Sequence, residues 1–336
     1  LKTARVKEIF GALRPRQVEL IQAISERPQP ETDFLFQRYP IDLQRKVNQY
    51  FATKQGFDWN HGRLDESAHP FTTNFGMDDV RLTTNYDEFN AMDALFSTMH
   101  ETGHGLYELG ISKAYKGTTI GGTSSMALHE SQSRLWENLV GRSKAFWSHF
   151  YPTLQAFFSE NLANVSLDKF YKAINKVSPS LIRTEADEAT YNLHIMLRFE
   201  IELGMIEGRI ATKDLPEIWN EKMRDYLGVV PSNDTTGVLQ DVHWSGGMIG
   251  YFPSYAIGNL IASQWWHQLL KDQPNTIDEI ASGNLANILT WLRENVHQHG
   301  SRYDSMDLVQ RVTGEPLNPD YYMNYLTEKY SEIYEL

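Results

Sequence analysis

The sequence contains no cysteine in its 336 residues. Without thiols, the chain cannot form disulfides, use thiol catalysis or bind zinc through cysteine sulfur. A chain of this kind fits a reducing compartment, where disulfides do not persist. We therefore predict a cytoplasmic protein.

Basic side chains are in the minority. The chain has 31 Lys and Arg against 43 Asp and Glu, which gives a formal net charge of −12. It also has no run of five or more basic residues, so it lacks the electrostatic footprint of a nucleic-acid-binding protein and should repel polyanions. We expect no nucleic acid among its partners.

One long segment contains no Asp, Glu, Lys or Arg residue. It runs from Val242 to Leu270, which is long enough to span a membrane. Several Ser, Asn, Gln, His and Gly residues interrupt it, and burying so many polar groups in hydrocarbon would be costly. We therefore expect no membrane contact and interpret the segment as a buried wall beside a cleft. The chain begins with Leu1 and has no signal-peptide pattern, so we expect it to be part of a longer gene product.

Apolar residues spaced three and four apart predict helices along most of the chain. Examples are the segments 88–109 and 193–203, and a Gly-rich loop before Met126 predicts the start of another helix. Thr184, with Asp187 three residues later, predicts a further helix start. The hydrophobic fraction of 41% is enough for a sizeable core.

Strand signals are few and short. The alternation in Val80–Thr84 predicts one strand, and Thr118–Ile120 is a weaker candidate. We find no repeat, no low-complexity tract and no flexible linker. The predicted fold class is therefore mainly α with a small β element, in one continuous body.

The clearest chemical motif is an H-E-x-x-H sequence within the predicted helix 88–109. Four residues make just over one helical turn, so His100 and His104 project from one face and can share a metal ion. Glu101 lies beside them and can act as the general base for a water that the metal activates. The alternative is a pair of surface histidines on an amphipathic helix.

The next predicted helix offers a third ligand. Glu130 lies early in that helix, and a hydrolytic metal site needs three protein ligands with an open fourth position. The alternative role for Glu130 is an ion pair with Arg134, four residues later. We expect His129 to lie behind the ligands or in the core, and Glu137 to support the site. The predicted cofactor is one divalent ion, with zinc favoured over cobalt or manganese.

Six segments together resemble a known family. They are His69-Pro70-Phe71, Asp79-Val80-Arg81-Leu82-Thr83, His100-Glu101-Thr102-Gly103-His104, His129-Glu130-Ser131-Gln132, Ile182-Arg183-Thr184-Glu185-Ala186-Asp187 and Gly237-Val238-Leu239-Gln240-Asp241-Val242-His243-Trp244. In this order they resemble the carboxypeptidase Taq family of zinc metallocarboxypeptidases. The resemblance extends from His69 to about Tyr255.

The resemblance implies a helical metallopeptidase with a deep cleft, similar in architecture to neurolysin and angiotensin-converting enzyme. It also implies a homodimer that removes single residues from peptide C-termini, so the expected partner is a peptide with a free C-terminus. Family chains are longer than this one. We therefore expect residues 1–336 to form a single catalytic domain, the C-terminal portion of a family chain, without the N-terminal region that forms part of the cleft wall and lid.

A carboxypeptidase needs a cation for the substrate carboxylate, and arginine has the suitable fork geometry. The family motif places an arginine at Arg183, next to a predicted helix start. The alternative for Arg183 is an ion pair with Glu185 or Asp187. Arg81 is a second candidate for this role, although an ion pair with Asp79 would suit it equally.

Oxyanion stabilisation needs hydrogen-bond donors aimed at the developing negative charge. By resemblance to neurolysin-like relatives, His243 and Tyr255 are the predicted donors, and Tyr251 is the alternative donor. For each of these aromatic residues, packing in the core is an equal alternative. His69 is expected in an extended loop, where it either lines the substrate subsites or caps a turn.

His297 and His299 are expected on a solvated surface rather than at a metal. The predicted function is thus a metal-dependent carboxypeptidase with Glu101 as general base. Two alternatives remain open at this point: a metallo-oligopeptidase or endopeptidase with the same site, and a truncated helical fragment without catalytic activity.

Overall fold

The computed structural model describes all residues from Leu1 to Leu336. The chain forms two compact units, each assembled from segments that are distant in the sequence. Unit 1 comprises Leu1–Gln29, Asn175–Ile257 and Pro319–Leu336, and unit 2 comprises Pro30–Ile174 and Gly258–Asn318. The prediction of a mainly helical protein with a small sheet is confirmed.

Unit 1 is helical. Its elements are α1 (Thr3–Ser25), η4 (Arg183–Glu185), α8 (Glu188–Ile206), η5 (Thr212–Asp214), α9 (Leu215–Leu227), the start of α10 (Pro253–Asp272) and α14 (Asp320–Tyr334). The buried residues of α1 recur at helical spacing, and Phe10 meets Phe199 of α8 edge to face with ring centroids 5.3 Å apart. An apolar stripe of this kind buries one face of a helix against its neighbours.

Helix α8 begins later than the sequence predicted. The Asp187 carboxylate accepts hydrogen bonds from the backbone N–H groups of Ala189 and Thr190, at 2.9 and 3.0 Å. Asp187 is therefore the N-cap, because its side chain satisfies backbone donors that have no helical partner. Thr184 lies instead in the short turn η4, and the extended backbone of Ala186 separates that turn from the helix. The predicted start at Thr184 is wrong for this reason.

Unit 2 contains the remaining elements. They are η1 (Asp33–Phe36), α2 (Ile41–Gln55), β1 (Gly62–Glu66), β2 (Thr72–Gly76), β3 (Asp79–Thr84), α3 (Ala91–Gly110), η2 (Lys113–Tyr115), α4 (Met126–Arg134), η3 (Leu135–Val140), α5 (Lys144–Phe157), α6 (Ser159–Leu162), α7 (Leu167–Ile174), the main part of α10, α11 (Thr276–Ala281), α12 (Ala286–Asn295), η6 (His297–His299) and α13 (Ser305–Thr313).

The sheet has three strands in the order β1-β3-β2. The central strand β3 pairs parallel with β1 and antiparallel with β2. The strand predicted at Val80–Thr84 is confirmed as part of β3. The second candidate, Thr118–Ile120, is wrong: hydrogen bonds from Thr118 N–H to the Tyr115 carbonyl and from Gly121 N–H to the Thr118 carbonyl make these residues successive turns.

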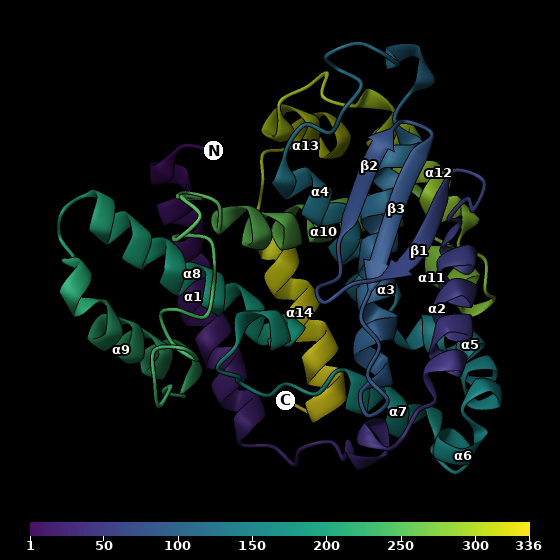
Figure 1. The fold of residues 1–336 in the computed structure, drawn as a ribbon, viewed down its shortest axis with the longest axis horizontal. Helices are drawn as coiled ribbons and strands as arrows, with labels where there is room; N and C mark the ends of the chain where they lie inside the picture. Colours follow the sequence, from purple (N-terminus) through teal and green to yellow (C-terminus); the bar gives the residue numbers. More distant parts are fainter. The chain divides into compact units, whose positions relative to one another are not determined.

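Helix α3 lies between the sheet and α4, and the strands run alongside it in Figure 1. Two glycines make both contacts close. A Cβ atom on Gly105 would lie 2.9 Å from the Phe57 ring and 3.0 Å from Leu82 of β3. A Cβ atom on Gly103 would lie 2.7 Å from the backbone oxygen of Gln132 in α4. Residues two positions apart on a helix are separated by about 200° around its axis. Gly105 therefore faces the sheet and Gly103 faces α4, on opposite sides of α3.

Helix α4 begins as predicted, after the Gly-rich loop. The hydroxyl of Ser125 accepts a hydrogen bond from the N–H of Leu128 at 3.2 Å and so caps the helix. At Leu135 the helix widens into the π-helical segment η3, a rare geometry that is frequent at functional sites. No helix in the structure has both the length and the hydropathy that spanning a membrane would require.

Candidate metal centre

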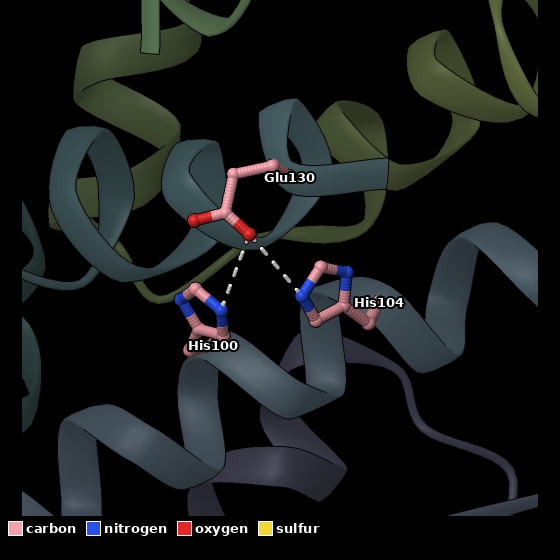
Figure 2. Close-up of side chains that lie close together, drawn as sticks. All are labelled: His100, His104 and Glu130. Carbon is pink, nitrogen blue, oxygen red and sulfur yellow. Dashed lines mark ion pairs between the residues drawn. The ribbon is translucent and has the colours of Figure 1, made fainter. Parts of the chain in front are cut away.

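Three donor side chains converge between α3 and α4 in unit 2. Figure 2 shows His100 and His104 projecting from one helix toward Glu130 on the other. The Glu130 Oε2 atom lies 3.7 Å from Nε2 of His100 and 3.6 Å from Nε2 of His104. The three ligand atoms lie within 4.8 Å of one another. The structure therefore brings together the three side chains that the sequence predicted as metal ligands.

The group fits a divalent metal ion. In a tetrahedral zinc site with bonds of about 2 Å, two ligand atoms are separated by about 3.3 Å. The distances from Glu130 Oε2 to the two imidazole nitrogens, 3.6 and 3.7 Å, are close to this value. Two imidazoles and a carboxylate also form a common donor set for hydrolytic zinc. A Cβ atom on Gly258 would lie 2.7 Å from the Glu130 Cβ, so this glycine makes room for the Glu130 side chain.

The two carboxylate oxygens of Glu130 have different neighbours. Its Oε2 atom faces the two imidazoles, while its Oε1 accepts a hydrogen bond from Nε of Arg134 at 2.8 Å. Burial raises the pKa of the Glu130 carboxyl, but Arg134 and His100 outweigh burial, and the net shift is downward. The ligand oxygen therefore belongs to an ionised carboxylate.

Glu137 supports His100 from the π-helical segment, as expected. Its Oε2 lies 2.8 Å from Nδ1 of His100, and it also accepts a hydrogen bond from Nη1 of Arg134 at 3.2 Å. Burial alone would raise the pKa of Glu137, but Arg134 and His100 outweigh burial and hold that pKa at about 2. A charged carboxylate on Nδ1 leaves Nε2 of His100 to face the metal position.

Glu101 is buried in α3, next to the first residue of β2. The Thr72 hydroxyl in β2 has two acceptors within reach of its one proton, Oε2 of Glu101 at 2.6 Å and the Glu101 carbonyl oxygen at 2.9 Å. Burial raises the pKa of the Glu101 carboxyl above its ordinary value. A carboxylate that is more basic than usual and held in one orientation has the properties of a general base.

Arg183 lies in unit 1, within a buried polar cluster. Its Nε donates to Oδ1 of Asp241 at 2.9 Å, and its Nη1 donates to the Tyr191 hydroxyl at 3.1 Å. The ion-pair partner of Arg183 is therefore Asp241, which lies far along the chain. The sequence had offered Glu185 and Asp187 for this contact. Burial lowers the pKa of Arg183, but Tyr191 and Asp241 outweigh it, and the net shift is upward.

A second arginine, Arg198, shares the same aspartate and was not singled out from the sequence. Its Nε donates to Oδ2 of Asp241 at 2.7 Å, and its Nη2 donates to the Gln240 side-chain oxygen at 2.7 Å. Arg198 has no exposed surface. Two cations therefore share one carboxylate in this cluster. The sequence signal that could have identified Arg198 is its position in a helix whose residues are apolar on nearly every side, which indicates a buried helix.

The three predicted oxyanion donors form a neighbouring aromatic group in unit 1. Nε2 of His243 lies 3.2 Å from the Tyr255 hydroxyl. The Tyr251 ring centroid lies 5.5 Å from that of His243 and 5.4 Å from that of Tyr255. Burial lowers the pKa of His243, which favours its neutral form.

The two remaining substrate-binding candidates lie around the sheet of unit 2. His69 is exposed in the loop between β1 and β2, and its carbonyl accepts a hydrogen bond from the Ser67 hydroxyl at 2.6 Å. Arg81 forms the alternative ion pair, the one with Asp79, with contacts of 3.0 and 2.9 Å. The Arg81 guanidinium also lies over the Phe75 ring, 4.6 Å from its centroid.

The expectation of a solvated His297 is wrong. His297 is fully buried, and its Nε2 lies 2.7 Å from the side-chain oxygen of Gln132 in α4. The reason is a contact between distant segments: the turn η6 packs against the end of α3, where Gly110 leaves space for the His297 ring. His299, two residues later, is partly exposed.

Known proteins resemble this chain in sequence and in fold. The family model described as carboxypeptidase Taq (M32) metallopeptidase matches residues 1–330. Carboxypeptidase 1 of Bacillus subtilis is 43% identical over 330 residues, which are 98% of this chain and 66% of that protein. Thermostable carboxypeptidase 1 of Thermus thermophilus is 46% identical over 337 residues, with 99% of this chain and 66% of that protein covered.

A solved structure shares the fold. The crystal structure of the M32 carboxypeptidase from Deinococcus radiodurans superposes with a TM-score of 0.98 at 42% identity, covering 100% of this chain and 68% of that one. The chain thus spans 66% of the length of the two curated relatives above.

Proposed function

This chain belongs to the carboxypeptidase Taq (M32) metallopeptidase family, and from that membership we propose that it is a metal-dependent carboxypeptidase. It would hydrolyse the C-terminal peptide bond of peptides. The observation that carries the proposal is the meeting of His100, His104 and Glu130 around one point, with the buried carboxylate of Glu101 on the same helix. Three protein donors leave one position of a tetrahedral ion for water or substrate.

Glu101 is the proposed general base. A divalent ion bound by the three donors would lower the pKa of a water molecule and polarise the carbonyl of the scissile bond. Thr72 holds Oε2 of Glu101, which leaves Oε1 to take the proton as the water attacks. The same carboxyl group then delivers the proton to the leaving amine.

The finer assignments are part of the proposal. We favour zinc over cobalt or manganese, since zinc is the usual ion for a His, His, Glu set in hydrolases. A homodimer in the cytoplasm is likewise proposed, and sedimentation of the purified chain and fractionation of its source cells test these two points. We also propose that residues 1–336 act as a single catalytic domain.

Most of the residues proposed to bind the substrate lie in unit 1. Arg183 is the proposed partner of the substrate carboxylate. Arg183 and Arg198 carry two positive charges, and Asp241 neutralises one of them, which leaves one positive charge for the substrate. His243 and Tyr255, with Tyr251 as the alternative, are the proposed oxyanion donors. His69 and Arg81 stay candidates for substrate contacts.

The deciding experiment compares one short peptide with a free C-terminus and the same peptide with a C-terminal amide. A carboxypeptidase that recognises the terminal carboxylate should lose most of its kcat/KM on the amide. Equal cleavage of both peptides, or cleavage at internal bonds, would favour the metallo-oligopeptidase alternative. Cleavage of neither by the metal-loaded chain would favour the non-catalytic fragment.

A further inference from the structure

We propose that His129 and Glu108 are positioning residues that fix the tautomer and the orientation of the metal ligand His104. The inference rests on the proposed function, since it concerns how this chain holds its metal. His104 and Glu108 lie on α3, and His129 lies on α4 next to the ligand Glu130. All of these groups belong to unit 2.

The three side chains form a continuous hydrogen-bonded chain. Nδ1 of His104 lies 2.5 Å from Nδ1 of His129, and Nε2 of His129 lies 2.8 Å from Oε1 of Glu108. The second carboxylate oxygen, Oε2 of Glu108, accepts a hydrogen bond from Nδ2 of Asn74 at 2.6 Å. The chain thus runs from the metal position through two imidazoles and one carboxylate to strand β2.

The positions of the protons follow from the identity of the atoms. Nε2 of His104 faces Glu130 and must carry no proton if it is to bind a metal ion. In a neutral imidazole the other nitrogen then carries the proton, so Nδ1 of His104 is the donor toward His129. Nδ1 of His129 must accept that bond, and its Nε2 therefore carries a proton that it donates to the Glu108 carboxylate.

Only this order is compatible with metal binding. If His129 were doubly protonated, its Nδ1 would also be a donor, and Nδ1 of His104 would have to accept. The proton of His104 would then lie on Nε2, which would block the ligand atom. The Glu108 carboxylate, an acceptor on both oxygens, thus selects the tautomer of His129, and His129 selects that of His104.

Removing the acceptor should weaken metal binding. In a His129→Phe variant, the Nδ1–H of His104 would be buried without a partner, and the ring would be free to turn. Loss of such an outer partner typically weakens metal affinity by about 10- to 100-fold. A His129→Gln variant supplies an amide oxygen that can accept the same proton, so it should recover most of the loss.

The structure offers a matched control for these variants. His297 is a fully buried histidine, whereas His129 is partly exposed, and the Tyr107 ring centroid lies 5.3 Å from the ring centroids of both. The Nε2 atom of His297 is bonded to Gln132 and not to a predicted metal ligand. A His297→Phe variant should therefore show a lower Tm with an unchanged affinity for the metal.

The test is a zinc titration of the metal-free full chain in competition with a chromogenic chelator. The inference predicts weaker zinc binding for His129→Phe, recovery by His129→Gln and no change for His297→Phe. It is overturned if folded His129→Phe binds zinc as tightly as the wild type, or if His297→Phe weakens binding equally. A wild-type chain that binds no zinc would contradict the proposed function as well.

Should His129→Phe fail to fold, two further measurements decide. Glu108→Leu should weaken zinc binding, whereas Glu108→Gln, which keeps an acceptor oxygen for His129, should weaken it less. In the zinc-loaded wild type labelled with ¹⁵N-histidine, long-range proton–nitrogen NMR spectra should place the His129 proton on Nε2. A proton on Nδ1 of His129 in a zinc-bound chain overturns this inference alone and leaves the proposed function standing.

Discussion

Arg198 donates a hydrogen bond from its Nε to Oδ2 of Asp241 over 2.7 Å, and the Arg198 side chain has no exposed surface. Burial lowers the pKa of Arg198 to about 10, so it stays charged at neutral pH. A charge without solvent depends on its counter-ion. Asp241 is that counter-ion, and it holds Arg183 with its other oxygen.

The Asp241→Asn variant should therefore unfold more easily. Breaking a buried ion pair by removing one partner costs about 3 kcal/mol or more. Asp79→Asn, which breaks an exposed aspartate–arginine pair, is the matched control and should leave the Tm almost unchanged. Thermal or urea unfolding at pH 7 gives both values. An Asp241→Asn variant as stable as the wild type would show that the pair contributes nothing.

The effect of Asp241 should also depend on pH. Burial raises the pKa of Asp241, but Arg198 and Arg183 outweigh it and hold that pKa below its ordinary value. The ionised carboxylate thus stabilises the fold fully above the unfolded-state pKa of about 3.9, and this contribution is lost as the pH falls through the lower folded-state pKa. The stability difference between wild type and Asp241→Asn should shrink between pH 5 and very acidic conditions. A difference that does not change with pH would contradict this assignment.

The Glu137→Gln variant should fold like the wild type but bind metal more weakly. The variant keeps a hydrogen-bonding oxygen near His100 but removes the negative charge on its Nδ1 side, and lost outer partners typically reduce metal affinity by about 10- to 100-fold. Zinc competition with a chelator measures the change. Glu160→Gln, an exposed carboxylate in the same unit, is the control and should bind zinc like the wild type. Equal affinities for all three proteins would remove Glu137 from the site.

Gly103→Ala should separate α3 from α4. The added Cβ would lie 2.7 Å from the Gln132 backbone oxygen and 2.8 Å from the Ser133 Cα, and backbone atoms cannot move aside cheaply. We expect a lower Tm together with weaker zinc binding, because the ligands come from both helices. Gly11→Ala is the control: nothing lies within 4 Å of its Cβ position in α1, so alanine should raise the stability by about 0.5–1 kcal/mol. Unchanged zinc binding in Gly103→Ala would contradict the close-packing argument.

Arg183→Gln should affect substrates with a free C-terminus most. Losing a hydrogen bond to a charged group costs about 1.5–3 kcal/mol, which corresponds to roughly 10- to 150-fold in kcat/KM. The loss should be much smaller on the amidated peptide. Arg209→Gln, which breaks an exposed ion pair in the same unit, should behave like the wild type. An equal loss on both peptides would show that Arg183 acts only through its contact with Asp241.

The meeting of the three proposed metal ligands could be predicted because much of their geometry is local. His100 and His104 lie one helical turn apart, so the sequence alone places both imidazoles on one face. Glu130 followed from the need for a third ligand and from a second motif on the next helix. Glu137 was expected at the site from its spacing, although the π-helical segment that carries it was not predicted.

The groups that sequence reasoning missed depend on contacts between distant segments. The burial of Arg198 is possible only because Asp241, on a loop far along the chain, reaches it. The strand β1, Gly62–Glu66, is rich in charge and becomes a strand by pairing with β3. His297 is buried because Gly110 leaves room for its ring. No local spacing signals such contacts.

The central claim is that Glu101 acts as the base beside a bound metal ion. The most direct test measures the metal content and the peptidase activity of the wild type and of Glu101→Gln, on a short peptide with a free C-terminus. The account predicts one equivalent of divalent metal in both proteins, with kcat lowered by about 10²- to 10⁴-fold in the variant. Metal in both proteins with equal activity, or a wild type without metal that still cleaves the peptide, would contradict it.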